Sequence, residues 1–358
     1  MTTKHAVEIR TGSGSLSAGE GFRTLIMALV GASHPRQFEE QARKIQALFS
    51  CSAHPEIISD LSIVRSANEP PLWRRVINET CAAAATLPVY SVKPSADGRI
   101  APSELLDIAI EQMEAGVGLM TIHPTPCKQI NDLALTRLVT FTSRGGGLII
   151  NDAKRREWKG DNIYLQILPE LIKHAKRNGT VLSLGASYRS ANIFDSCDAA
   201  QTKEIEVQTQ LACEISRHGV GVIIESPGHA RPRDIKKVAA LLRPSGFPVM
   251  PLGPIPTDTA VGQDHISSAI GATLMGLERC AHILAAVTRE EHTGGIPSVE
   301  STLEAVAAAK VAAHIIDLEL LGEDKLDREI ALARSQARTC LSMKKSHGCD
   351  RCARACPL

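Results

Sequence analysis

Short runs of apolar, often β-branched residues recur along this chain, and longer stretches of helical periodicity separate them. The eight runs span residues 25–31, 87–92, 118–123, 137–142, 181–185, 220–225, 248–253 and 283–288. Apolar residues three or four positions apart mark the intervening stretches 38–49, 102–115, 162–177, 199–217, 233–242 and 264–278. This alternation is typical of repeated strand–helix units around a parallel sheet. The sequence therefore predicts an α/β fold, a (β/α)8 barrel of the TIM type.

Two further helical stretches, 298–321 and 323–338, follow the last predicted strand. We divide the chain into a leader (1–20), the barrel (21–297), a C-terminal helical segment (298–340) and a tail (341–358). Residues 11–15 are rich in glycine and serine, but no strand precedes them and no dinucleotide fingerprint follows. We therefore interpret them as part of a flexible leader.

The tail places three thiols, Cys349, Cys352 and Cys356, within eight residues. Their spacing is similar to that of the last three cysteines of a bacterial ferredoxin run, including the proline that follows. Three thiolates on a four-iron four-sulfur (4Fe-4S) cluster leave one iron open to a substrate or cofactor, so such a cluster can perform chemistry. The alternatives are a closed Cys3His zinc site that includes His347, and thiols without a metal.

Charge and cysteine usage exclude several classes of function. With 40 Lys and Arg against 39 Asp and Glu, the net charge of +1 provides no global field that attracts nucleic acid or an anionic membrane. The first residues lack the apolar core of a signal peptide, and no run of about eighteen apolar residues follows. The other cysteines are scattered singly. We expect a reduced, cytoplasmic protein with no nucleic-acid or membrane partner.

Polar or glycine-rich residues follow several predicted strands. Active sites of such barrels lie at the C-terminal ends of the strands, so we expect these residues to converge. They are Tyr90, His123, the stretch 143–147, Arg189 and Glu225. Residues 143–147 combine a hydroxyl, a guanidinium and unhindered backbone N–H groups, which suit a phosphate monoester. An ordinary flexible turn is the alternative.

His229 and His265 each lie close in sequence to an acidic residue, Glu225 and Asp264 respectively. Two imidazoles can hold a metal ion, with carboxylates as ligands or as hydrogen-bond partners of the ligands. Two ordinary polar histidines are the alternative. Glu225 could accept a proton or hold a substrate amine, or it could be an ion-paired carboxylate.

Short segments between about residue 85 and residue 335 share a pattern with one known family. These segments are 114–123, 142–146, 182–185 with Arg189, 225–229, 252–254, 257–258, 264–271, 287–288, 291–292 and 312–314 with Asp317. In this order they resemble the phosphomethylpyrimidine synthase family of thiamin biosynthesis, whose members are atypical radical S-adenosylmethionine enzymes.

The resemblance implies a homodimer of barrels in which the cluster tail reaches over the active site of the partner subunit. It also implies that the cluster, supplied by an external electron donor, cleaves S-adenosylmethionine to a deoxyadenosyl radical. The implied substrate is aminoimidazole ribotide. A lyase of this kind rearranges it to hydroxymethylpyrimidine phosphate with loss of formate and carbon monoxide.

Carried onto this chain, the resemblance implies three sites. The ribotide pocket would consist of Tyr90, His123, Ser143, Arg144, Gly145, Arg189 and Glu225, with Glu225 and His123 as the catalytic groups. An additional zinc or iron ion would bind His229 and His265. The 4Fe-4S cluster would bind Cys349, Cys352 and Cys356. Two alternatives stay open: an enzyme similar to hydroxybenzimidazole synthase, which makes the lower ligand of a cobamide, and a catalytically inactive ribotide-binding or zinc-stabilised paralogue.

Overall fold

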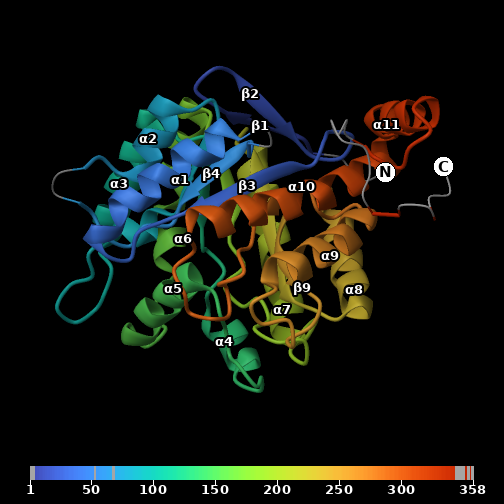
Figure 1. Ribbon diagram of the computed structural model, residues 1–358. Coiled ribbons are helices and arrows are strands. Elements are labelled where there is room, and N and C mark those ends of the chain that lie inside the picture. The colour runs from blue at the N-terminus through green and yellow to red at the C-terminus, as the bar shows by residue number, and fades with distance from the viewer. Residues whose placement is uncertain (1–4, 52–53, 67–68, 343–350, 353–354, 356–358) are drawn as a thin grey trace.

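The centre of the molecule is a barrel of parallel strands, seen in a computed structural model that describes residues 5–51, 54–66, 69–342, 351–352 and 355 (Figure 1). Eight strands of the described chain pair in the order β10-β3-β4-β5-β6-β7-β8-β9. They are β3 (Leu25–Val30), β4 (Ile57–Asp60), β5 (Ala83–Thr86), β6 (Leu119–Ile122), β7 (Val181–Leu184), β8 (Val222–His229), β9 (Val249–Ile255) and β10 (Ile283–Ala285). The N–H of His282, just before β10, donates to the carbonyl of Val249 in β9 at 2.8 Å, which joins the two edges. The predicted (β/α)8-type barrel is confirmed.

Helices surround the barrel on its outer face (Figure 1). They are α1 (Phe38–Ser50), α2 (Leu72–Glu79), α3 (Pro102–Ala115), α4 (Lys128–Ala134), α5 (Arg144–Arg155), α6 (Ile163–Asn178), α7 (Ala199–Arg217), α8 (Pro232–Leu242), α9 (Asp264–Leu277) and α10 (Val299–Leu321). Helix α11 (Lys325–Gln336) follows α10 in the chain. The 3-10 helices of the described chain are η1 (Pro35–Gln37), η2 (Pro88–Ser91) and η3 (Arg243–Ser245). Among the described residues, none of these helices has the length and apolar character needed to span a membrane.

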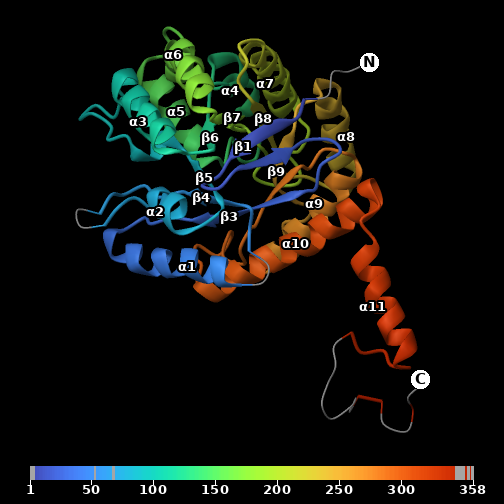
Figure 2. The same ribbon diagram turned by 90° about the horizontal axis from the view of Figure 1, so that it is seen from above.

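The two C-terminal helices differ in their relation to the barrel. Helix α10 packs against α9, α1 and β3. Helix α11 has no buried residue and projects away from the barrel (Figure 2). The chain that leads to the tail therefore leaves the barrel of its own subunit.

Two of the predicted strands are wrong. In place of a strand at 87–92, the structure has η2, and the strand lies just before it in β5. The sequence signal misled because alanine, which fills most of β5, has a low strand propensity. Pro88 has no N–H to give to a sheet ladder, and instead it begins the 3-10 helix.

Residues 137–142 form a loop between α4 and α5 rather than a strand. The backbone N–H groups of Leu138 and Val139 donate to the carboxylate of Asp195, each at 3.1 Å, and not to a neighbouring strand. The eighth strand of the barrel is instead β4, which the apolar pattern did not predict and which pairs with β3 and β5. Only its first two residues, Ile57 and Ile58, are apolar, so β4 does not stand out as an apolar run in the sequence.

A β-hairpin closes the N-terminal end of the barrel. Strands β1 (Val7–Arg10) and β2 (Ser15–Ala18) pair in antiparallel register, and the Thr11 N–H donates to the Gly14 carbonyl at 2.8 Å in the turn. Ile9 is fully buried in one cluster with inward-facing strand residues. A Cβ on Gly118 would lie 2.1 Å from the Arg10 carbonyl oxygen, so the hairpin sits directly against the start of β6. The interpretation of residues 11–15 as a flexible segment is therefore wrong, whereas the domain division stays a prediction.

Candidate active site

Inward-facing residues of three neighbouring strands change from apolar to polar toward the C-terminal end of the barrel. The pairs, two positions apart on β6, β7 and β8, are Leu119 and Thr121, Val181 and Ser183, and Ile223 and Glu225. The hydroxyls of Thr121 and Ser183 both donate to Oε1 of Glu225, at 2.9 Å and 3.0 Å. The buried carboxylate is thus the centre of a polar floor.

Burial raises the pKa of Glu225, and the Thr121 hydroxyl, the charge of Arg189 and the Ser183 hydroxyl act in the opposite direction. Only 4% of the residue is exposed. A carboxylate that is held by hydroxyls in a nearly dry site can accept a hydrogen bond or a proton from a ligand with little reorganisation.

His123 follows β6 and is buried beside this floor. Its Nε2 lies 3.3 Å from the Ser143 hydroxyl, and its Nδ1 has no partner among the described residues. Burial, together with the charge of Arg189, lowers the pKa of His123 to about 3. The imidazole is therefore neutral at physiological pH, with one ring nitrogen available to a ligand.

Two glycines make room for this imidazole. A Cβ on Gly145 would lie 2.4 Å from Cε1 of His123, and a Cβ on Gly185 would lie 2.6 Å from its Nε2. Both distances are far below a normal van der Waals contact. The end of β7 and the stretch that follows Ser143 can approach the ring only because they carry glycine there.

The stretch 143–147 begins a helix and is not a loop after a strand. Ser143 is the N-cap of α5, and its hydroxyl accepts a hydrogen bond from the Gly146 N–H at 3.0 Å. A helix N-terminus presents free N–H groups and a partial positive charge, which suit an anion such as phosphate. The Arg144 guanidinium lies 5.5 Å from the centre of the Tyr90 ring, over its face.

Tyr90 and Arg189 lie close to Glu225, His123 and the start of α5. Burial raises the pKa of Tyr90, whereas the charges of Arg144 and Arg189 and the Gly145 N–H lower it. The charge of Arg189 also acts on His123 and Glu225. The structure thus brings all seven predicted pocket residues into one neighbourhood, and their role in binding a ribotide stays a prediction.

His229, which ends β8, lies beside His292 and not beside the predicted partner His265. The Nε2 atoms of His229 and His292 are 3.0 Å apart. Nδ1 of His229 lies 2.7 Å from Asp258, and Nδ1 of His292 lies 2.6 Å from Asp264. His265 instead has its Nε2 3.7 Å from Glu304. The sequence analysis missed His292 and Asp258 as members of this site, because the end of β8 and the segments that follow β9 and β10 supply the group.

This arrangement fits a metal ion. Two imidazole nitrogens on a tetrahedral zinc, each about 2.0–2.1 Å from the metal, would lie about 3.3 Å apart. Histidines that bind metals commonly pass their other ring N–H to a carboxylate, as both do here. Within the described part of the chain, no group of three or more His, Cys, Asp or Glu side chains forms a metal site.

The cluster prediction concerns residues at the edge of the described chain. Cys349 and Cys356 lie outside the described residues, and Cys352 is a half-buried free thiol. Thiolates are the usual ligands of iron–sulfur clusters, so a free thiol at Cys352 fits this role. Cluster binding by these three residues stays a prediction.

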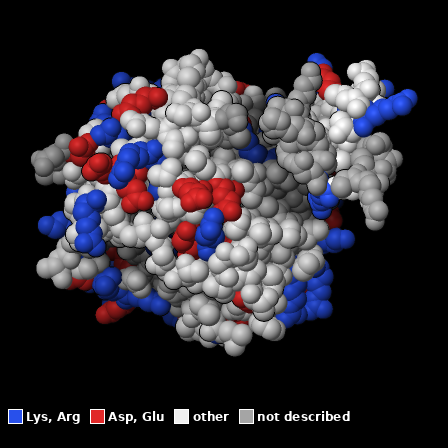
Figure 3. Space-filling model, viewed as in Figure 1, with Lys and Arg blue, Asp and Glu red and all other residues white. Residues whose placement is uncertain are grey.

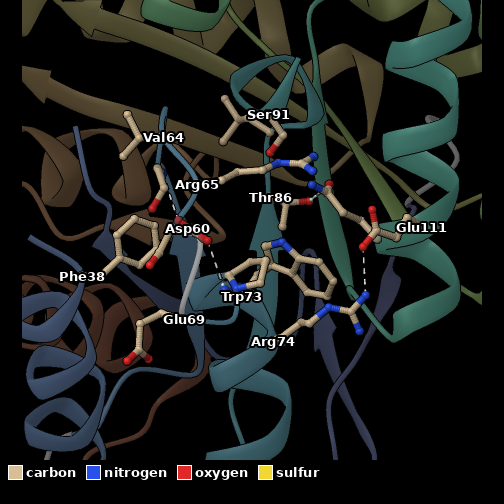
Figure 4. Close-up of a pocket in the computed structure, with 15 residues that line it drawn as sticks. Phe38, Asp60, Val64, Arg65, Glu69, Trp73, Arg74, Thr86, Ser91 and Glu111 are labelled. Atoms are coloured by element: carbon tan, nitrogen blue, oxygen red, sulfur yellow. Dashed lines mark hydrogen bonds and ion pairs between the residues drawn. The ribbon is translucent and has the colours of Figure 1, made fainter. Parts of the chain in front are cut away.

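A cavity of about 280 Å³ lies apart from these residues, beside α2 and α3 (Figure 4). The Asp60 carboxylate at its wall accepts the Trp73 N–H at 3.1 Å, and Arg74 pairs with Glu111 at 2.9 Å at its rim. The chain itself thus satisfies these polar groups. The lining includes none of the predicted site residues.

Comparison with known proteins identifies the family. A family model described as "Radical SAM ThiC family" matches residues 6–354. The chain belongs to the Radical SAM ThiC family. This membership makes it an enzyme of the radical SAM ThiC type, a type whose chemistry requires a 4Fe-4S cluster and S-adenosylmethionine.

Phosphomethylpyrimidine synthases are among the curated relatives of this ThiC-family chain. It is 32% identical over 348 residues to the one from Alkaliphilus metalliredigens, covering 94% of this chain and 78% of that protein. It is 31% identical over 336 residues to the one from a Thermotoga species, strain RQ2, covering 88% and 76%. A solved dihydropteroate synthase from Yersinia pestis aligns with a TM-score of 0.47 and 11% identity, covering 86% of this chain and 100% of that one.

Proposed function

We propose that this protein is a radical S-adenosylmethionine lyase that rearranges aminoimidazole ribotide, or a related ribotide, to hydroxymethylpyrimidine phosphate in thiamin biosynthesis. The observation that carries the proposal is the convergence of Glu225, neutral His123, Arg189 and the N-terminus of α5 at one end of the barrel. Family membership and relatives that are phosphomethylpyrimidine synthases support it.

The pocket residues divide the binding of a ribotide between them. The Ser143 hydroxyl, the Arg144 guanidinium and the partial positive charge at the N-terminus of α5 offer a donor and charge to the phosphate. Glu225 can accept a hydrogen bond from an amine or hydroxyl of the ligand, and His123 can bond it through the free Nδ1. Holding the phosphate at one end fixes the orientation of the ring that reacts.

Cys349, Cys352 and Cys356 would hold the cluster, which when bound would supply the electron for reductive cleavage of S-adenosylmethionine. For the additional zinc or iron ion, we now assign His229 and His292 in place of His229 and His265. Asp258 and Asp264 would hold the two rings in the orientation that points both Nε2 atoms at the ion.

A second copy of the chain would complete the site. Helices α9 and α10 expose apolar side chains at helical spacing: Ile266 and Ile270 on α9, and Val311, Ile315 and Leu318 on α10. Figure 3 shows few charges over α9 and the neighbouring part of α10. Helix α11 leads away from its own barrel (Figure 2). A homodimer would cover this apolar surface and allow the tail of one subunit to reach the pocket of the other.

One observation favours a related ribotide as the second candidate substrate. Inward-facing residues on the strands that continue the barrel beyond β8 are apolar: Met250 and Leu252 on β9, Ala285 on β10 and Leu29 on β3. A base that faces this side finds no hydrogen-bonding side chain among these four. A ribotide whose base is less polar than aminoimidazole would pay a smaller desolvation free energy when its base leaves water and faces these side chains.

Anaerobic reconstitution of the full-length protein tests the proposal. With dithionite as the electron donor, S-adenosylmethionine and aminoimidazole ribotide, we expect 5′-deoxyadenosine and a product with the mass of hydroxymethylpyrimidine phosphate. Formation of deoxyadenosine with a product of another mass would point to the related ribotide chemistry. A fully loaded cluster that yields no deoxyadenosine with any ribotide would refute the proposal.

A further inference from the structure

The face of α7 that packs on the barrel carries buried polar side chains. Gln201, Glu204 and Gln208 are 2%, 1% and 0% exposed. The side-chain amide of Gln201 donates to the Pro227 carbonyl at 2.7 Å. That of Gln208 donates to the carbonyls at the end of β7 and in β8, at 2.8 Å and 3.1 Å. Helix α7 therefore bonds to the backbone of the strand ends that carry the pocket.

Glu204 makes the densest set of these bonds. Its Oε1 accepts from the Thr125 hydroxyl at 2.6 Å and from the Ser187 N–H at 2.7 Å. Its Oε2 accepts from the Tyr188 N–H at 2.8 Å. Both oxygens are therefore occupied by donors from loops outside α7.

The donors that bond to Glu204 lie next to two pocket residues in the sequence. Thr125 lies two residues after His123, and Tyr188 directly precedes Arg189. One carboxylate thus ties the loop after β6 to the loop after β7, and each loop carries a pocket residue.

Burial of the Glu204 carboxylate has an unfavourable desolvation free energy. Burial raises the pKa of Glu204 to about 7, against the opposing effect of its hydrogen bonds and of Arg137 on the neighbouring loop. A buried charged group usually contributes less to stability than apolar packing of similar volume. Apolar side chains at these positions of α7 would therefore be enough to pack the helix on the barrel. They would not hydrogen-bond to the two loops, as Glu204 does.

We propose that Glu204 is a positioning residue, which fixes Arg189 relative to His123 and thereby sets the orientation of the bound ligand. The identity of that ligand rests on the proposed function, whereas the link between the two loops does not. Glu204 itself touches no ligand in this account.

The first test is backbone hydrogen exchange of the full-length protein with Glu204→Gln. The amide group replaces one acceptor oxygen with a donor, so one of the loop bonds is lost. We expect exchange of the segments around Thr125 and around residues 187–188 to rise about tenfold, with the β1–β2 hairpin unchanged. The matched control is Glu206→Gln, because Glu206 lies on the exposed face of the same helix and pairs with Lys203.

The second test separates positioning from a merely structural role. Titration calorimetry should show about tenfold weaker binding of aminoimidazole ribotide to Glu204→Gln, with the affinity for inorganic phosphate unchanged. Phosphate alone needs the start of α5, which Glu204 does not contact. Glu204→Asp retains the carboxylate and should recover part of the lost ribotide affinity.

Three results would overturn the inference. One is unchanged exchange in both loops of Glu204→Gln. Another is faster exchange throughout the barrel in both Glu204 variants, with phosphate affinity lost in parallel, which would make the residue purely structural. The third is unchanged ribotide affinity in Glu204→Gln. If the wild-type protein binds no ribotide, the proposed function fails, and the exchange result still decides the role of Glu204.

Discussion

The two ends of the barrel are built from the same strands, yet on β6, β7 and β8 the inward-facing residues change from apolar at one end to polar at the other. At the N-terminal end, Leu119 and Val181 pack with Ile9 of the hairpin in a closed apolar cluster. Two positions further along the same strands, Thr121 and Ser183 hydrogen-bond to the carboxylate of Glu225. The same strands of a barrel can thus carry apolar residues that stabilise the fold at one end and polar residues that bind a ligand at the other. Substitutions at one end should leave the properties of the other unchanged.

The largest expected effect concerns Cys352 in the tail. Cys352→Ala should reduce cleavage of S-adenosylmethionine by at least about 100-fold, because the cluster loses one of three thiolates. The melting temperature should stay the same, since α11 has no buried residue. Chromatography of deoxyadenosine and calorimetry measure the two effects. Cys340→Ala is the control, because Cys340 is an exposed free thiol outside the group of three. A collapse of thermal stability in Cys352→Ala would mean that the tail is structural.

The next prediction concerns which histidines bind the additional metal ion at the C-terminal end of the barrel. In the Cys352→Ala background, where the cluster no longer contributes iron, His292→Ala should reduce the bound zinc or iron from about one ion per chain to almost none. His265→Ala should retain the ion, because the Nε2 of His229 lies beside His292. Elemental analysis after dialysis distinguishes the two. Loss of the ion in His265→Ala alone would restore the pairing predicted from the sequence.

At the N-terminal end, Ile9→Ala should lower the free energy of unfolding by about 2–5 kcal/mol, because it leaves a cavity in the fully buried cluster. Urea unfolding measures this change. Ribotide affinity of the folded variant should equal that of the wild type. A parallel loss of affinity would show that the two ends are not independent.

A smaller effect follows from the histidine at the C-terminal end. The pKa of His123 is about 3 in the folded protein against 6.5 in the unfolded chain. The folded state therefore binds fewer protons than the unfolded state below pH 6.5, and stability is lost as the pH falls from there. The expected loss is about 2 kcal/mol between pH 8 and pH 5.

His123→Gln should remove this part of the pH dependence in urea unfolding. His282→Gln is the matched variant, because burial lowers the pKa of His282 to about 4 at the opposite end, just before β10. Each substitution should flatten the profile by a similar amount. A profile that His123→Gln leaves unchanged would mean that the imidazole is not buried as described.

Much of the barrel could be predicted because its strands are apolar runs bounded by turns. The bounds of α3 and α7 agree with the predicted stretches 102–115 and 199–217. Alanine-rich β5 gave no such signal, and the apolar residues at 137–142 gave a false one. Tertiary bonds to Asp195 decide the conformation there, and no local pattern encodes them.

The candidate site divides in the same way. Residues at strand ends, such as His123 and Glu225, could be predicted because barrel geometry makes strand ends converge. The pairing of His229 with His292 could not, since it depends on where the loop after β10 places His292 relative to the end of β8. Glu204 gave no signal either, because an acidic residue within a helical stretch is usually a solvated one, and only the fold shows that it faces two loops.

The central claim is that the polar end of the barrel binds a phosphorylated ribotide that reacts with S-adenosylmethionine. The most direct measurement compares deoxyadenosine formation by the reconstituted full-length protein with aminoimidazole ribotide and with the riboside that lacks the phosphate. The account predicts formation with the ribotide and at least about tenfold less with the riboside, because the start of α5 then has no anion to hold. Equal formation with both compounds, or none with either, would contradict it.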